Sequence, residues 1–121
     1  RASMTVELTE SDYESTVTEA EIALVQCWAP WCKACVAGAS AFERTAREHP
    51  EHVFGKVYTE WAIARTDRLG CEHVPTLRVY RGGFLLFKKA GTFSEDQLES
   101  IVSQVESVNM EAVRAEFANS D

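Results

Sequence analysis

The feature that most constrains the fold of this chain is an apolar segment, Ile22–Trp28, followed closely by two cysteines, Cys32 and Cys35. A nearly continuous apolar run of this kind is typical of a central strand that is covered on both faces. Apolar and small residues then recur at helical spacing as far as Glu48, which predicts a helix. We therefore expect a strand-to-helix junction with Cys32 at the start of the helix and Cys35 in its first turn.

A helix start gives these two cysteines different chemistry. Unpaired backbone N–H groups and the positive end of the helix dipole stabilise an anion at this position. Because thiolate is the reactive form of cysteine, the position favours Cys32 as the nucleophile. Cys35 lies on the same side of the first turn and can attack a mixed disulfide held on Cys32. The spacing therefore predicts a redox pair that cycles between dithiol and disulfide.

A structural zinc site is the alternative for the same two cysteines. Such a site needs four ligands at recognisable spacing, and the sequence has no second C-x-x-C. The remaining candidate ligands are isolated: Cys27, Cys71, His49, His52 and His73. We expect Cys27 to be a small core residue and Cys71 to be a spectator thiol. We therefore expect no metal at the cysteine pair.

Charge and hydropathy exclude several classes of function. The formal net charge is −7, and the basic residues form no run, so we expect no nucleic-acid partner. No apolar run is long enough to span a bilayer, so we expect no membrane partner. The sequence shows no signal peptide, which favours the cytoplasm, where a C-x-x-C is more often catalytic than structural. We expect a monomer.

The rest of the chain predicts alternating strands and helices. Strands are expected over residues 6–8, 22–28, 53–58, 76–80 and 84–88. Helices are expected over residues 10–20, 36–48, 61–69 and 95–105. Capping boxes at Thr9–Asp12 and Ser94–Gln97 mark the starts of the first and last helices. This order implies parallel crossovers followed by an antiparallel hairpin, and so a mixed α/β sheet between helices.

The domain boundaries follow from the same pattern. Residues 4–107 are expected to form one domain, a length that suits a single core. Residues 1–3 precede Met4 and are interpreted as a vector remnant. Residues 108–121 form a C-terminal extension that is either helical or frayed, and it either lengthens the last helix or adds a short one.

The chain resembles the thioredoxin family over about residues 5–107. The resemblance rests on the W-A-P-W-C-K-A-C stretch from Trp28 to Cys35, on Val74-Pro75-Thr76, on the turn at residues 80–83 and on Gly91. A W-C-x-x-C with a V-P-T downstream at this distance is a highly specific pair. The resemblance implies the thioredoxin fold, with a central mixed sheet of four or five strands flanked by four helices.

The resemblance also implies an activity and a site. It implies a reductase of disulfides in client proteins, which is itself reduced by a flavoprotein reductase that uses NADPH. The chain itself would then bind no cofactor. Cys32 is implied as the exposed nucleophile and Cys35 as the buried resolving cysteine. Pro75 is implied to follow a cis bond that presents the backbone of Val74 to an extended substrate. The residues implied to line the substrate groove are Trp31, Val74, Pro75 and Gly91.

Two departures from the family pattern bear on the chemistry. Gln26 stands where the family has a buried aspartate, and an amide cannot accept the proton of the Cys35 thiol. Lys56 matches a family lysine near this position. Lys33 opens a Lys-Ala pair in place of the common Gly-Pro, and its charge beside the thiolate predicts a more oxidising couple. These departures keep open a dedicated oxidase or isomerase, or a client-specific binding module with little reductase activity.

Overall fold

The computed structural model describes residues 4–58 and 74–119, and within them five strands form one mixed sheet. The strands are β1 (Val6–Leu8), β2 (Ile22–Trp28), β3 (Val53–Tyr58), β4 (Thr76–Arg81) and β5 (Phe84–Ala90). Their order across the sheet is β1-β3-β2-β4-β5. β3 pairs in parallel with β1 and β2, whereas β4 pairs antiparallel with β2 and β5. The apolar run is therefore the central strand, as predicted.

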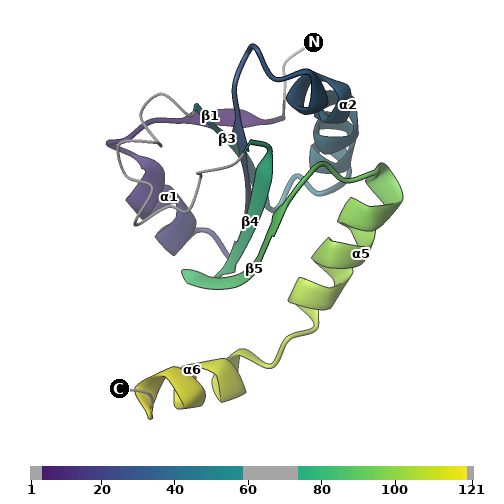
Figure 1. Cartoon of the computed structure of the whole chain (residues 1–121). Coiled ribbons are helices and arrows are strands. Elements are labelled where there is room, and N and C mark those ends of the chain that lie inside the picture. The colour runs from purple at the N-terminus through teal and green to yellow at the C-terminus, as the bar shows by residue number, and fades with distance from the viewer. Residues whose placement is uncertain (1–3, 59–73, 120–121) are drawn as a thin grey trace.

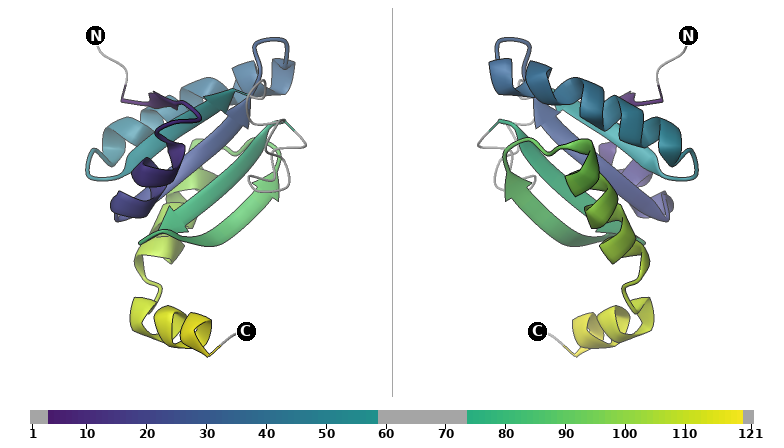
Figure 2. Two further views of the ribbon diagram at one scale, coloured as in Figure 1. Left: turned by 90° about the vertical axis from the view of Figure 1, so that its left-hand side faces the viewer. Right: turned by 90° about the vertical axis from the view of Figure 1, so that its right-hand side faces the viewer.

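The helices cover both faces of this sheet. The described helices are α1 (Tyr13–Glu19), α2 (Lys33–Glu48), α5 (Glu95–Glu106) and α6 (Met110–Ala118). α1 lies on one face, α2 and α5 lie on the other, and α6 lies beyond the end of α5 (Figures 1 and 2). The helix expected over residues 61–69 lies outside the described residues. The expected architecture, a mixed sheet between helices, is confirmed.

The alternating side chains of β2 build two separate cores. Ile22 and Leu24 point toward α2 and α5 and pack with Phe42 and Phe54. The side chains that alternate with them, at positions 23, 25 and 27, point to the other face, where they pack with Leu8 and residues of α1. Because both faces are covered, the strand is apolar at nearly every position.

Cys27 differs from the expected free thiol. It is fully buried in the α1-side core, which agrees with the prediction of a core residue. Its sulfur, however, takes part in a disulfide. It is therefore a core residue, as predicted, and also a cross-linked one, which the sequence did not indicate.

The start of α1 also differs from the prediction. Thr9 was the expected N-cap, but the helix begins one turn later, with Asp12 as its N-cap. The backbone N–H of Thr9 donates to Asp12 Oδ1 at 2.7 Å, and the N–H of Tyr13 donates to the Thr9 carbonyl at 3.0 Å. The capping residues thus close a separate turn that precedes the helix.

The C-terminal helices follow their capping signals. Ser94 and Gln97 form the predicted capping box of α5. α6 is a separate helix with its own N-cap, Asn109, whose side chain accepts from the N–H of Ala112. Of the two outcomes expected for this segment, an added short helix is the one observed. None of the described helices has the length and apolar character needed to cross a bilayer.

Candidate active site at the start of α2

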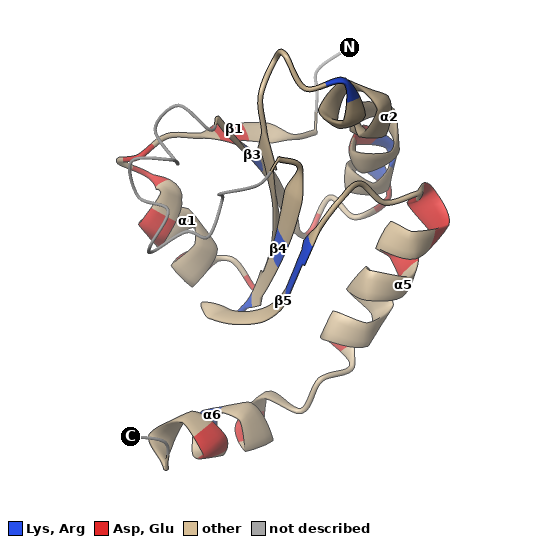
Figure 3. Ribbon diagram, in the orientation of Figure 1, with Lys and Arg blue, Asp and Glu red and all other residues tan. Residues whose placement is uncertain are grey.

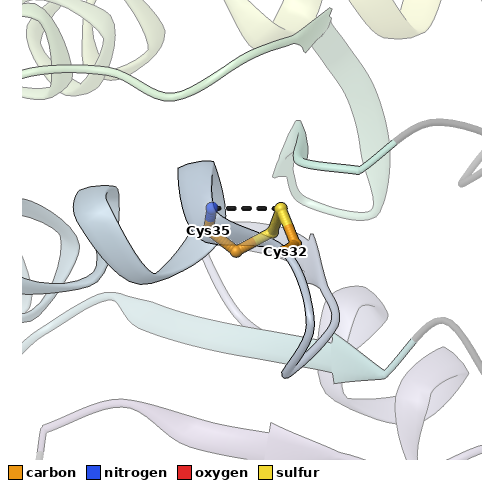
Figure 4. Close-up of a disulfide and its surroundings, with 2 residues drawn as sticks. All are labelled: Cys32 and Cys35. Carbon is orange, nitrogen blue, oxygen red and sulfur yellow. Dashed lines mark hydrogen bonds between the residues drawn. A yellow bond between two sulfur atoms is a disulfide. The ribbon is translucent and has the colours of Figure 1, made fainter.

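Cys32 and Cys35 form a disulfide at the N-terminus of α2, with their Cα atoms 5.2 Å apart. Cys32 is the N-cap residue of the helix, and its backbone is extended. The backbone N–H of Cys35 donates to Cys32 Sγ at 3.1 Å, and Figure 4 shows this nitrogen directed at the sulfur. The predicted strand-to-helix junction is confirmed, and the two sulfurs lie on the same side of the first turn.

The structure does not separate the two cysteines by exposure. Cys32 was expected to be exposed, but it is 7% exposed and Cys35 is 8% exposed. In the disulfide form both pack in a small cluster with Ala29, against which Trp28 and Val74 also pack. What distinguishes them is position: Cys32 lies outside the helix, and of the two sulfurs it is the one that accepts a backbone N–H from the described residues.

Three of the expected groove residues meet beside the disulfide. Val74 packs against the cysteine cluster, and the Val74–Pro75 bond is cis, as implied by the resemblance. The Pro75 carbonyl accepts the backbone N–H of Gly91 at 2.8 Å. Gly91 has a φ of +116°, a region that favours glycine. Trp31, next to Cys32 in sequence, is 72% exposed.

A pocket of about 120 Å³ opens on the inner side of Cys35. Its lining includes Gln26, Trp28 and Lys56 from the sheet, together with Thr92 and Phe93 from the loop after β5. Gln26 and Lys56 are partners in the β2–β3 register, and Lys56 Nζ lies 5.6 Å from the centroid of the Trp28 ring. The predicted neighbours of the resolving cysteine, Gln26 and Lys56, therefore share one pocket with it.

The pocket contains buried polar atoms. Gln26 Nε2 and Trp28 Nε1 are buried and have no hydrogen-bond partner among residues 4–58 and 74–119. An unpaired buried N–H group is costly, and this mainly apolar pocket is large enough to hold a water molecule beside these two atoms. Lys33 is the first residue of α2 and is exposed, so it lies beside Cys32 at the surface and outside the pocket.

Two residues of this region were not found from the sequence. Val36 belongs to the apolar stripe of the helix, yet it is 63% exposed and lines the pocket. Thr92 also lines the pocket, and no motif or periodic pattern in the sequence indicated this. A Cβ placed on Gly38 would lie 2.8 Å from Thr92 Cγ2, so the glycine allows α2 and this loop to approach closely.

The structure separates the cysteine pair from the histidines that zinc would need. His49 and His52 follow the far end of α2. A helix of 16 residues is about 24 Å long, so these rings are remote from the disulfide. His73 and Cys71 lie outside the described residues. The alternative of zinc on Cys32 and Cys35 thus gains no support from the described histidines.

A disulfide at the mouth of a helix, packed on a mixed five-stranded sheet beside a cis proline, defines a thiol–disulfide oxidoreductase of the thioredoxin fold. The chain belongs to the thioredoxin family, because the family model described as thioredoxin matches residues 4–104. The implied fold and the implied activity on protein disulfides are therefore confirmed.

Individual relatives agree with this membership. The chain is 34% identical over 114 residues to a putative thioredoxin 2 of Streptomyces coelicolor, covering 94% of this chain and 85% of that protein. It is 36% identical over 87 residues to protein disulfide-isomerase A4 of Bos taurus, but this match spans only 13% of that protein. A mutant thioredoxin from Halobacterium salinarum superposes with a TM-score of 0.76 at 20% identity, covering 90% of this chain and 98% of that one.

Proposed function

We propose that this chain reduces disulfides of client proteins, with Cys32 as the attacking sulfur. The Cys32 thiolate attacks one sulfur of the client disulfide, that bond breaks, and the other client sulfur leaves as a thiolate. Cys35 then attacks Cys32 Sγ, which releases the second client thiolate and leaves the chain oxidised. Two electrons thus pass to the client. The observation that carries this assignment is the N–H of Cys35, which donates to Cys32 Sγ at 3.1 Å.

The position of Cys32 at the helix start makes its thiolate more stable than that of Cys35, which supports Cys32 as the attacking sulfur. One backbone N–H and the positive end of the dipole of α2 both stabilise a negative charge on its sulfur. Cys35 lies inside the helix and lines the pocket, and its sulfur accepts no backbone N–H from residues 4–58 and 74–119. The low exposure of Cys32 applies to the oxidised form, in which the sulfur is tied to Cys35.

The client is proposed to bind in an extended form next to the cis proline. An extended segment can pair with the backbone of Val74, as a strand adds to a sheet edge. Trp31, the residue before Cys32, is widely exposed and offers apolar surface to the client. The backbone N–H of Gly91 donates to the Pro75 carbonyl, so Gly91 lies at the same client-binding surface.

Re-reduction is proposed to come from a flavoprotein reductase that takes electrons from NADPH. The chain would then act as a monomer in the cytoplasm and would need no bound cofactor for this reaction. A cytoplasmic reductant pool favours the dithiol form, which is the form that can reduce clients.

The test is the reduction of a model protein disulfide by dithiothreitol, with and without this chain. We expect catalysis by the parent and none by Cys32→Ser, whereas Cys35→Ser should accumulate a mixed disulfide with the client. Absence of catalysis by the parent would contradict a reductase. If Cys32→Ser then still bound clients, a client-specific binding module would be favoured, and oxidation of reduced clients by the disulfide form would favour an oxidase or isomerase.

A further inference from the structure

Two histidines and two glutamates meet at the end of α2 that is remote from the cysteines. His49 is the C-cap residue of α2, and Glu51 and His52 lie in the turn that leads to β3. Glu106 is the last residue of α5. Each of the four offers one ligand atom, and these atoms lie within 4.8 Å of one another. The thiol–disulfide activity gives this cluster no role.

The distances in this cluster are close to those of a zinc site. Glu51 Oε2 lies 3.6 Å from His49 Nδ1 and 3.6 Å from His52 Nε2. Glu106 Oε2 lies 2.9 Å from His52 Nε2. Tetrahedral zinc with bonds of about 2.1 Å holds neighbouring ligand atoms about 3.4 Å apart. The cluster therefore needs only small side-chain shifts to enclose an ion.

A further carboxylate supports one of the two rings. Glu99 Oε1 lies 2.8 Å from His49 Nε2, on the nitrogen that does not face the cluster. Metal-bound histidines commonly place their second ring nitrogen on such a carboxylate, which fixes the tautomer and the orientation of the ring. This contact leaves His49 Nδ1 available to an ion.

The two rings are held by packing. They stack with their centroids 5.9 Å apart and their planes 11° apart, and the His49 ring also stacks on Phe54. The His52 side chain is only 4% exposed, and its Nδ1 has no hydrogen-bond partner among the described residues. Its polar contacts are thus those of Nε2 with the two carboxylates of the cluster. Glu51 and Glu106 are about half exposed, so they can adjust around a bound ion.

The local charge favours a cation. Three carboxylates, Glu51, Glu99 and Glu106, surround the two rings, and Figure 3 shows acidic positions along α5. Imidazole and carboxylate together suit zinc and similar divalent ions of the first transition row.

We propose that His49, Glu51, His52 and Glu106 form a binding site for zinc or a similar divalent transition-metal ion, with Glu99 supporting His49. The site joins the C-terminal ends of α2 and α5. An ion bound there stabilises the native state because the unfolded chain does not hold these ligands together. The site is independent of the cysteine pair at the other end of α2.

The experiment uses the full chain in its oxidised form, so that neither Cys32 nor Cys35 is a thiol that can capture the metal. The protein is equilibrated with zinc chloride near neutral pH and desalted, and retained zinc is measured together with the calorimetric affinity. We expect one zinc ion per chain. His49→Gln and Glu106→Gln should each weaken the affinity by about 100-fold, and Glu99→Gln by about 10-fold.

Glu48→Gln is the matched control, because it removes a neighbouring negative charge that supplies no ligand atom. Its affinity should stay within about 2-fold of the parent, since a single exposed charge contributes little. Cobalt loading gives a second readout: the visible spectrum of tetrahedral Co²⁺ should appear in the parent and vanish in His49→Gln. Circular dichroism confirms that each variant is folded. The proposal is overturned if the oxidised parent retains no zinc, if His49→Gln binds like the parent, or if Glu48→Gln weakens binding as much as the ligand variants.

Discussion

At the scale of single residues, one backbone N–H distinguishes two cysteines that are equally buried. The N–H of Cys35 donates to Cys32 Sγ at 3.1 Å, while the side chain of Cys35 faces the pocket with Gln26 and Lys56. In the proposed cycle a thiolate on Cys32 is therefore stabilised in the free enzyme, whereas Cys35 loses its proton at the moment of attack. The groups in the pocket decide how readily that second proton leaves.

Gln26→Asp should accelerate the resolving step. A carboxylate at this position can accept the proton of the Cys35 thiol, which the amide cannot, and a positioned base contributes about 100-fold. We expect a rise of about 10-fold or more near neutral pH, at some cost in stability from the buried charge. The measurement is the rate of mixed-disulfide resolution against pH, with Gln26→Asn as the uncharged control. No gain for Gln26→Asp would show that the amide has no kinetic consequence.

Replacing Lys33 and Ala34 by Gly-Pro should lower the reduction potential. The Lys33 charge beside Cys32 stabilises the thiolate and hence the reduced form, so its removal favours the disulfide. Each 30 mV of change corresponds to about 1.4 kcal/mol for this two-electron couple. The measurement is equilibration with a glutathione buffer, and Lys88→Met serves as a control that removes an exposed cation from β5. An unchanged or higher potential for the Gly-Pro variant would contradict this account.

At the scale of elements, α2 connects the cysteine pair to the rest of the fold. Its first residues carry the disulfide, its middle packs Phe42 and Ala46 into the core, and its end reaches His49. A glycine within it, Gly38, faces the loop after β5 at Thr92. Glycine inside a helix lowers the free energy of unfolding by about 1 kcal/mol relative to alanine. At this position the close approach of Thr92 explains why glycine is present.

Gly38→Ala should destabilise the chain despite the better helix propensity of alanine. The new Cβ would lie 2.8 Å from Thr92 Cγ2 and 2.9 Å from Thr92 Cβ, which forces the loop away from α2. Overpacking of this kind costs about 1–3 kcal/mol, more than the propensity gain. Urea unfolding measures the loss. The double variant Gly38→Ala with Thr92→Ala removes the Cγ2 contact and should recover part of the stability; equal stability of parent and Gly38→Ala would refute the clash.

At the scale of the whole molecule, one arginine joins the hairpin to the C-terminal helices. Arg81 Nη1 donates to the carbonyls of Val105, Glu106 and Val108 at 2.7–2.9 Å. Val105 and Glu106 end α5 and Val108 lies in the link to α6, so the arginine satisfies carbonyls at a helix C-terminus. α6 is then held on the hairpin by the contact of Phe84 with Phe117, whose ring centroids are 4.7 Å apart.

Arg81→Lys should loosen this junction while keeping the charge. A lysine ammonium cannot reproduce the reach and planar geometry of the guanidinium, so most of the three contacts are lost. Hydrogen bonds to charged groups contribute about 1.5–3 kcal/mol, and we expect a loss of that order in the free energy of unfolding. Hydrogen exchange should speed up first in α6. Protection of α6 that equals the parent's would show that the contacts of Arg81 do not hold the helix.

The sequence by itself determined the central strand, the helix start and the chemistry of the cysteine pair. Each of these depends on residues that are neighbours along the chain: the run Ile22–Trp28, the spacing of Cys32 and Cys35, and the capping box at Ser94. Local backbone hydrogen bonding and helical periodicity carry this information, so it can be read from a short window. The prediction of the start of α1 was wrong because two adjacent turns use the same capping residues.

Only the tertiary structure decided the burial of Cys32, the disulfide of Cys27, the exposure of Val36 and the meeting of His49 and His52 with Glu106. None of these features can be inferred from residues that are adjacent in the sequence, because each depends on the packing around the residue. His52 and Glu106, for example, meet because α2 and α5 pack side by side on the same face of the sheet. Side-chain periodicity tells which face a residue occupies, but the partner across that face is set by how the elements pack.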